Sequence, residues 1–174
     1  MPIFRILLIL VGLYIGALGT AYAQSTPRNF VAHLDGIEEV PVRDTAGVGQ
    51  AFFQLNAAGT ELHYRLIASN IENVVAAHIH LGVAGVNGPV VAFLFGNVPP
   101  AGGRTDGVLA TGTITSANLV GPLAGMSLAV LIAAMVEAGT YANVHTNDGV
   151  PPTNEGPGDF PGGEIRGQIR LAGN

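Results

Sequence analysis

Short apolar segments recur along the whole chain, separated by turns rich in glycine, proline and asparagine. Only 11% of the residues are charged and 25 are glycine, which suits compact β-structure with tight turns better than disorder. We expect strands over residues 30–35, 49–55, 62–68, 75–81, 90–95, 108–114, 141–146 and 164–171. The sequence therefore predicts an all-β fold, a Greek-key β-sandwich or flattened barrel of about eight strands with one helical insertion.

The helical insertion is predicted over residues 128–138, which are rich in alanine, leucine and methionine. Apolar residues recur there at helical spacing: Leu128, Leu131, Ile132, Met135 and Val136. Ser127 stands where it would cap the start of this helix, and Gly139 stands where the helix would end. We therefore expect an amphipathic helix whose apolar face packs against the sheets and closes one end of the sandwich.

The first residues carry the features of a secretory signal peptide. Arg5 supplies a positive charge, an apolar run follows it, and Ala21-Tyr22-Ala23 forms a small-x-small cleavage site. Residues 1–23 are therefore expected to be removed, and residues 24–174 to form one exported domain, secreted or periplasmic, with no membrane segment after cleavage. The alternative is an uncleaved anchor, since the uncharged run is almost long enough to span a bilayer.

Composition argues against several classes of function. From Gln24 onward the chain has six arginines, no lysine and twelve carboxylates, whereas binding to nucleic acid needs a basic surface. The chain has no cysteine, so an exported domain must rely on its core or on bound metal instead of disulfides. It also has no Gly-x-Ser-x-Gly elbow and no phosphate-binding loop. We therefore assign no catalytic residue.

Two expected strands carry histidines in an alternating pattern. Successive side chains of a strand point to opposite faces, so His78 and His80 share one face. Tyr141, Asn143 and His145 share a face of the later strand. If the two faces match, His78, His80 and His145 converge as ligands for copper or zinc. The alternative is that these histidines are polar residues satisfied by hydrogen bonds between strands.

Polar residues on the last expected strand are candidates to support this site. One face of the last expected strand carries Glu164, Arg166, Gln168 and Arg170. Such a face is typical of the solvated side of an edge strand. The alternative is a partly buried Glu164–Arg166 system that braces Asn143 or the His-x-His strand, in a structural role.

The remaining candidate residues fall into three further groups. His33 and His63 stand singly in strand patterns and are expected at the surface. The acidic residues Glu38, Glu39 and Asp44 surround a Val-Pro turn and are interpreted as an acidic loop instead of an ion site. Three more carboxylates lie in the long loop 147–163, where they are candidate oxygen ligands, for example for calcium: Asp148, Glu155 and Asp159.

Four segments resemble the CHRD domain family, which is named after chordin and also occurs alone in exported bacterial proteins. They are FVAHLDGIEEVP at 30–41, AHIHLGVAGVNGPVV at 77–91, GTYANVHT at 139–146 and PGGEIRGQI at 161–169. The resemblance extends over nearly all of residues 24–174. It implies an exported β-rich domain and brings no settled enzymatic activity.

A weaker similarity relates the chain to the copper/zinc superoxide dismutase family. That family carries a His-x-His strand ahead of a glycine-rich turn with a Gly-Pro step, and His78-x-His80 and Gly88-Pro89 look similar. The loop that builds the zinc site in that family has no counterpart after Gly82, and its cysteines are absent. The similarity implies a shared architecture with lost or reduced metal chemistry.

Two functions follow from these observations. The first is a non-catalytic exported CHRD-type β-sandwich that acts as a binding or structural module for an unidentified extracytoplasmic protein or ligand. The alternative is a copper- or zinc-binding protein with a site on His78, His80 and His145, with residual redox activity. Asn143, Glu164 and Arg166 would then support the three ligands.

Overall fold

The computed structural model describes residues 28–173, so the signal peptide expected over residues 1–23 lies outside the described part of the chain. Its strands are β1 (Asn29–Asp35), β2 (Val48–Leu55), β3 (Leu62–Glu72), β4 (Val74–Leu81), β5 (Val90–Phe95), β6 (Arg104–Ile114), β7 (Thr140–Thr146), β8 (Ile165–Gln168) and β9 (Arg170–Leu171). The helices are α1 (Leu128–Val136) and the 3-10 turns η1 (Ser116–Asn118) and η2 (Gly121–Leu123).

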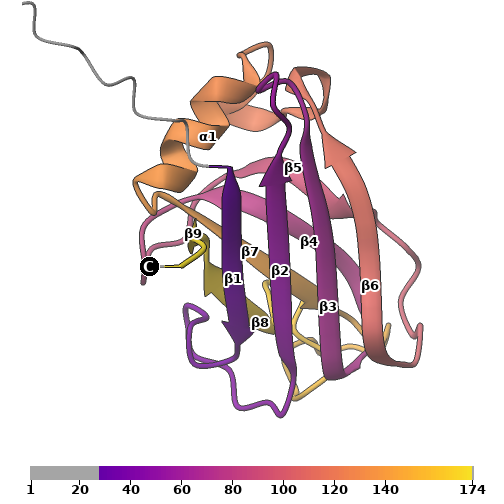
Figure 1. Cartoon of the computed structure of the whole chain (residues 1–174). Helices are drawn as coiled ribbons and strands as arrows, with labels where there is room; N and C mark the ends of the chain where they lie inside the picture. Colours follow the sequence, from indigo (N-terminus) through magenta and orange to yellow (C-terminus); the bar gives the residue numbers. More distant parts are fainter. Residues whose placement is uncertain (1–27, 174) are drawn as a thin grey trace, which may run out of the picture.

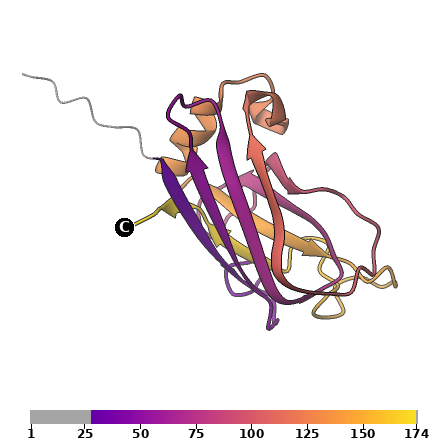
Figure 2. The same cartoon turned by 45° about the vertical axis from the view of Figure 1, so that its right-hand side comes forward.

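The strands form one antiparallel sheet that is nearly closed into a flattened barrel. Neighbouring strands follow the order β5-β4-β7-β8-β1-β2-β3-β6, and β9 pairs with β1. Strands β1, β2, β3 and β6 make the front layer in Figure 1, and β5, β4, β7 and β8 lie behind them. The turned view of Figure 2 shows the two layers obliquely. The predicted all-β sandwich or barrel with one helix is confirmed. Its non-sequential pairings, typical of a Greek key, include β6 beside β3, β7 beside β4 and β8 beside β1.

The two layers differ in how their strands are buried. In the front layer β3 alternates between buried and exposed residues, as expected for a sheet with one solvated face. In the back layer every residue of β7 is buried, and so is every residue of β8. One face of β7 packs into the hydrophobic core, so its other face must be covered by something else. That cover consists of loops, and it forms the candidate site described below.

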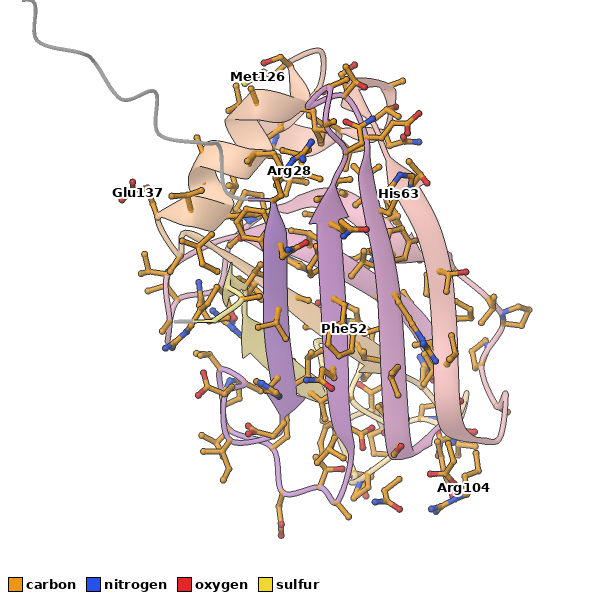
Figure 3. All side chains as sticks on the ribbon, viewed as in Figure 1. Arg28, Phe52, His63, Arg104, Met126 and Glu137 are labelled. Carbon is orange, nitrogen blue, oxygen red and sulfur yellow. The ribbon has the colours of Figure 1, made fainter. Side chains whose placement is uncertain are left out.

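Several strand boundaries differ from the expected ones by one residue, β3 extends to Glu72 instead of residue 68, and two further differences have a clear physical reason. β6 begins at Arg104, within residues predicted as loop, because its polar start pairs with the far end of β3. Arg104 lies at that end of β6 in Figure 3 and donates from Nη2 to Asn70 Oδ1 at 2.7 Å. The expected final strand is divided into β8 and β9, because Ile169 between them belongs to neither strand. The N–H of Ile169 donates to Thr140 O at 3.0 Å. Both differences arise from contacts between segments that are distant in the sequence, and hydrophobic periodicity does not predict such contacts.

The predicted helix is present and packs across one end of the barrel (Figure 1). Its buried side chains are Leu128, Leu131, Ile132 and Met135, all in the apolar stripe, while Val136 is only partly buried. The helix ends at Val136, slightly earlier than expected. No helix within residues 28–173 has the length and apolar character needed to cross a membrane.

Leu131 provides a test of this packing because it is 0% exposed, whereas its neighbour Val130 is 40% exposed. Leu131→Ala should lower the free energy of unfolding by about 2–5 kcal/mol, through lost burial and a residual cavity. Val130→Ala is the control and should change it by less than about 0.5 kcal/mol. Urea denaturation measures both values. Equal effects of the two substitutions would show that α1 does not contribute to the core as described.

Candidate functional site

Strands β4 and β7 place five aromatic or polar side chains on the outer face of the back layer. Their antiparallel register sets His78 opposite Asn143, His80 opposite Tyr141, and His145 opposite an alanine. The residues between them point inward and join the core: Ala77, Ile79, Ala142 and Val144. The expected matching of the two faces is therefore present.

Three loops cover this outer face and turn it into a buried polar layer. They are residues 36–47 between β1 and β2, residues 82–89 between β4 and β5, and residues 147–164 between β7 and β8. Two of these loops contact side chains of the layer directly, through Gly88 and Pro161, and the 36–47 loop is joined to the 147–164 loop by the hydrogen bond from Thr45 to Glu164. The layer thus lies outside the barrel and is nevertheless shielded from solvent.

The three histidines converge in this layer. His78, His80 and His145 are 9%, 8% and 9% exposed, and their candidate ligand atoms all lie within 4.8 Å of one another. The closest pair is His78 Nδ1 and His145 Nε2, at 3.0 Å. Among residues 28–173 these histidines form the one group of at least three His, Asp or Glu side chains with such spacing. The other two histidines are exposed as expected, and His63 lies on the front layer in Figure 3.

Main-chain carbonyls set the tautomers of two of these rings. His80 Nδ1 lies 2.8 Å from Gly88 O, and His145 Nδ1 lies 2.9 Å from Pro161 O. A carbonyl only accepts, so both Nδ1 atoms must carry a proton, and the Nε2 atom of each neutral ring holds a lone pair. His145 Nε2 then accepts from His78 Nδ1. The buried Nε2 atoms of His78 and His80 have no hydrogen-bond partner.

Burial keeps the cluster uncharged. Desolvation lowers the pKa of His78 to about 4, helped by the neighbouring His145 and His80. Desolvation likewise lowers the pKa of His145 to about 4, although its bond to Pro161 O opposes the change. Burial also lowers the pKa of His80. At neutral pH the three imidazoles are therefore in the neutral form that binds metal.

Aromatic rings flank the cluster. His80 stacks on Tyr141, with ring centroids 4.8 Å apart and planes inclined by 10°. Phe93 of β5 meets His78 edge-on at 4.8 Å. Tyr141 also lies beneath a cation, because Arg166 Cζ is 3.4 Å from its ring centroid. Since β7 lies between β4 and β8, the Tyr141 ring separates His80 from Arg166.

The polar face of the last strand is buried, so its interpretation as a solvated face is wrong. Glu164 and Arg166 are almost fully buried, Gln168 is buried, and only Arg170 is exposed. The alternative, a partly buried Glu164–Arg166 system in a structural role, is closer to the structure, although no ion pair joins the two residues within the described chain. Loops cover this face, and its two buried charged side chains, Glu164 and Arg166, bind different loops.

Glu164 fastens two of the covering loops to β7. Its carboxylate accepts from Thr45 Oγ1 and Thr146 Oγ1, both at 2.6 Å, and from the Gly158 N–H at 2.8 Å. Arg166 instead binds the 82–89 loop, through Asn87 Oδ1 at 3.1 Å and two main-chain carbonyls. Both residues therefore support the layer, as the sequence suggested, but they do so separately.

Glu39 is the site residue that the sequence did not reveal. It is 4% exposed and its Oε1 has no partner, whereas Glu38 and Asp44 are exposed as expected of an acidic loop. A side chain at Gly163 would meet both Glu39 Oε1 and Asn143 Nδ2, so these groups face the same small space. Burial raises the pKa of Glu39 to about 7, against the opposing effect of nearby Arg166. The pattern of charges in the sequence does not distinguish the buried Glu39 from the exposed Glu38.

The acidic residues of the 147–163 loop do not assemble into a site. Asp148 Oδ1 accepts from the Val150 N–H at 2.8 Å, and Asp159 Oδ2 accepts from the Glu155 N–H at 3.2 Å. These are local turns of the loop. Within residues 28–173 they join no cluster with ligand spacing, so the candidate calcium site has no support.

Comparison with known proteins agrees with this architecture. A model of the CHRD domain matches residues 30–169, nearly all of the part of the chain that the structure describes. The match includes both histidine strands, the three covering loops and β8. A comparison with curated proteins found no match.

The shifted pKa values predict how the stability of the metal-free protein depends on pH. The unfolded histidines take up protons near pH 6.5, whereas His78 and His145 in the folded protein do so only near pH 4. Stability should therefore fall as the pH drops through this interval. Glu39 has the opposite effect on stability. Its carboxyl takes up a proton below about pH 7 in the folded protein and only below 4.5 in the unfolded protein, so it stabilises the folded protein as the pH drops through this interval.

Glu39→Gln should remove this opposing contribution. Between pH 6.5 and 4.5 the free energy of unfolding of the variant should fall more steeply than that of the wild type, by up to about 1.4 kcal/mol per pH unit. Urea denaturation at several pH values in the presence of EDTA measures the two slopes. The exposed neighbour supplies the control, since Glu38→Gln should parallel the wild type. Parallel curves for Glu39→Gln and the wild type would contradict the buried, neutral state of Glu39.

Proposed function

The chain belongs to the CHRD domain family, and from this membership and the histidine cluster we propose that it is an exported module that binds a copper or zinc ion on His78, His80 and His145. Membership alone supports a binding or structural module. The metal is the finer part of the proposal and depends on the geometry of the buried layer.

One observation carries the metal proposal. His80 and His145 each fix an Nδ1 proton on a main-chain carbonyl, which leaves an Nε2 lone pair for another partner. His80 Nε2 is buried and has none. A buried acceptor without a partner costs about 1–3 kcal/mol, and a cation would remove that cost. Imidazole nitrogen is a ligand that both copper and zinc accept.

The spacing of the rings fits a metal after small adjustments. Two nitrogens bound to one tetrahedral zinc at about 2.0–2.1 Å lie about 3.3 Å apart, close to the 3.0 Å between His78 Nδ1 and His145 Nε2. For His78 Nδ1 to bind, its proton must move to Nε2 of the same ring. A bound ion would supply Lewis-acid chemistry, and copper would add one-electron redox chemistry. Protons would compete with the ion near pH 4, where His78 and His145 titrate, and not near 6.5.

A purely structural cluster is the second candidate function. The hydrogen bond between His78 and His145 favours it, because it already satisfies one nitrogen of each ring. In that case the histidines would join β4 to β7 and the layer would need no ion. The two functions differ in whether metal changes the stability of the folded protein.

Metal titration of the purified protein distinguishes them. Cu²⁺ or Zn²⁺ should raise the melting temperature, because an ion that binds only the folded state stabilises it by RT ln(1 + [L]/Kd). His80→Ala should abolish this increase, while the exposed His63→Ala should leave it unchanged. Calorimetric titration and thermal melts measure the effect. An equal response of the wild type and His80→Ala would contradict the metal site, as would a wild type that responds to neither ion.

Export is the remaining part of the proposal. Its support is the apolar segment after Arg5 and the Ala21-Tyr22-Ala23 motif. The exported product should begin at Gln24, which intact-mass measurement of protein recovered outside the cytoplasm determines. Ala23→Phe should block this processing, because the cleavage site requires a small residue. An exported wild type that keeps residues 1–23 would contradict cleavage.

A further inference from the structure

Arg166 is a buried charge without a carboxylate partner. Its side chain is 1% exposed, and no described acidic group lies within ion-pair distance of it. Burying a guanidinium is costly unless hydrogen bonds replace its hydration shell. Its hydrogen bonds all go to the 82–89 loop, and the ring it contacts is that of Tyr141. The carboxyl of Glu39 is near enough for Arg166 to oppose the rise of its pKa but lies outside ion-pair distance, so the direct contacts of this cation are with the elements around His80.

The guanidinium fastens the 82–89 loop at three points. Nη2 donates to Val83 O at 3.1 Å and to Val86 O at 3.0 Å, and Nη1 donates to Asn87 Oδ1 at 3.1 Å. The next residue, Gly88, supplies the carbonyl that holds His80 Nδ1 at 2.8 Å. The loop that Arg166 fixes therefore carries the acceptor that sets the His80 tautomer.

Gly88 itself has little freedom at this point. A Cβ atom there would lie only 1.5 Å from Leu81 O, so the loop backbone packs directly against the end of β4. The Gly88 N–H donates to Tyr141 Oη at 3.1 Å. These contacts hold the 82–89 loop close to β4. They require the loop to keep one backbone conformation.

Tyr141 provides a second connection between Arg166 and His80. The guanidinium carbon lies 3.4 Å from the phenol centroid, and the phenol stacks on the imidazole of His80 at 4.8 Å. The three planar groups thus form a continuous stack across β8, β7 and β4. A cation is attracted to a ring more strongly in a buried setting than at an exposed one, so the stack resists rotation of Tyr141.

We propose that Arg166 is the positioning residue of the metal site, because it fixes the tautomer and the ring plane of His80 through the 82–89 loop and through Tyr141. This inference rests on the proposed function. Arg166 binds neither the ion nor His80 directly. Lysine cannot replace it, since a single ammonium group lacks the planar fork that reaches three acceptors and stacks on a ring.

The first test measures metal affinity. Arg166→Gln and Arg166→Lys should both raise the Kd for Cu²⁺ or Zn²⁺ by about 10–100-fold, the usual loss when a partner of a metal ligand is removed. Arg170→Gln is the matched control on the same segment, and its exposed side chain should leave Kd unchanged. Leu131→Ala controls for lost stability alone and should also leave Kd unchanged. A wild-type Kd in Arg166→Lys would overturn the proposal, and so would an equal rise in Leu131→Ala.

The second test needs no metal. Long-range ¹H–¹⁵N spectra of the metal-free wild type should show His80 as the Nδ1–H tautomer, and Arg166→Gln should show a mixture of tautomers. A wild type that binds no metal would refute the proposed function, and the spectra would still decide the role of Arg166. Retention of a pure Nδ1–H tautomer in Arg166→Gln would overturn that role.

If Arg166→Gln does not fold, Asn87→Ala takes its place in both measurements. Asn87 is exposed and supplies one of the three acceptors, so the variant should fold, raise Kd less than tenfold and begin to mix the His80 tautomers. A wild-type Kd together with a pure tautomer in Asn87→Ala would overturn the proposal.

Discussion

The pairing of β4 with β7 is the constraint on which the rest of this structure depends. Every residue of β7 is buried, but only one of its two faces packs into the hydrophobic core. The other carries Tyr141, Asn143 and His145, and β4 adds His78 and His80 beside them. Such groups can be removed from water only if hydrogen bonds replace those they lose. The covering loops exclude water and supply some of these bonds, through Gly88 O to His80 and Pro161 O to His145, but the Nε2 atoms of His78 and His80 stay without a partner.

The loops are held without disulfides, since the chain contains no cysteine. Buried charged side chains take over this role: Glu164 joins two loops to β7, and Arg166 fixes the third. The loops are also joined to each other, because Asn87 Nδ2 donates to Val40 O at 2.7 Å. Removing either charged residue would take a hydrogen-bond partner from main-chain groups of the loops, which ties the integrity of the layer to the stability of the domain.

Periodicity was sufficient to predict most of the strands, the helix and the shared face of the histidines on each strand, whereas the convergence of all three histidines also required β4 to pair with β7. Alternation alone places His78 and His80 on one face, and the antiparallel register then brings His145 to them. The burial of Glu39 and of the polar face of β8 was not predictable in this way. Alternation identifies a polar face without stating whether solvent or a loop covers it, and Glu39 differs from Glu38 only through contacts with distant strands. The early start of β6 has the same origin, because its polar residues pair with β3.

Diffraction from crystals soaked in Cu²⁺ or Zn²⁺, recorded at the absorption edge of the metal, tests the central claim most directly. The account predicts one anomalous peak in the layer between β4, β7 and the covering loops, with nitrogens of His78, His80 and His145 about 2.0–2.1 Å from it. The Nδ1 atoms of His80 and His145 should remain bonded to Gly88 O and Pro161 O. Crystals that diffract well and show no anomalous peak at these three histidines would contradict it.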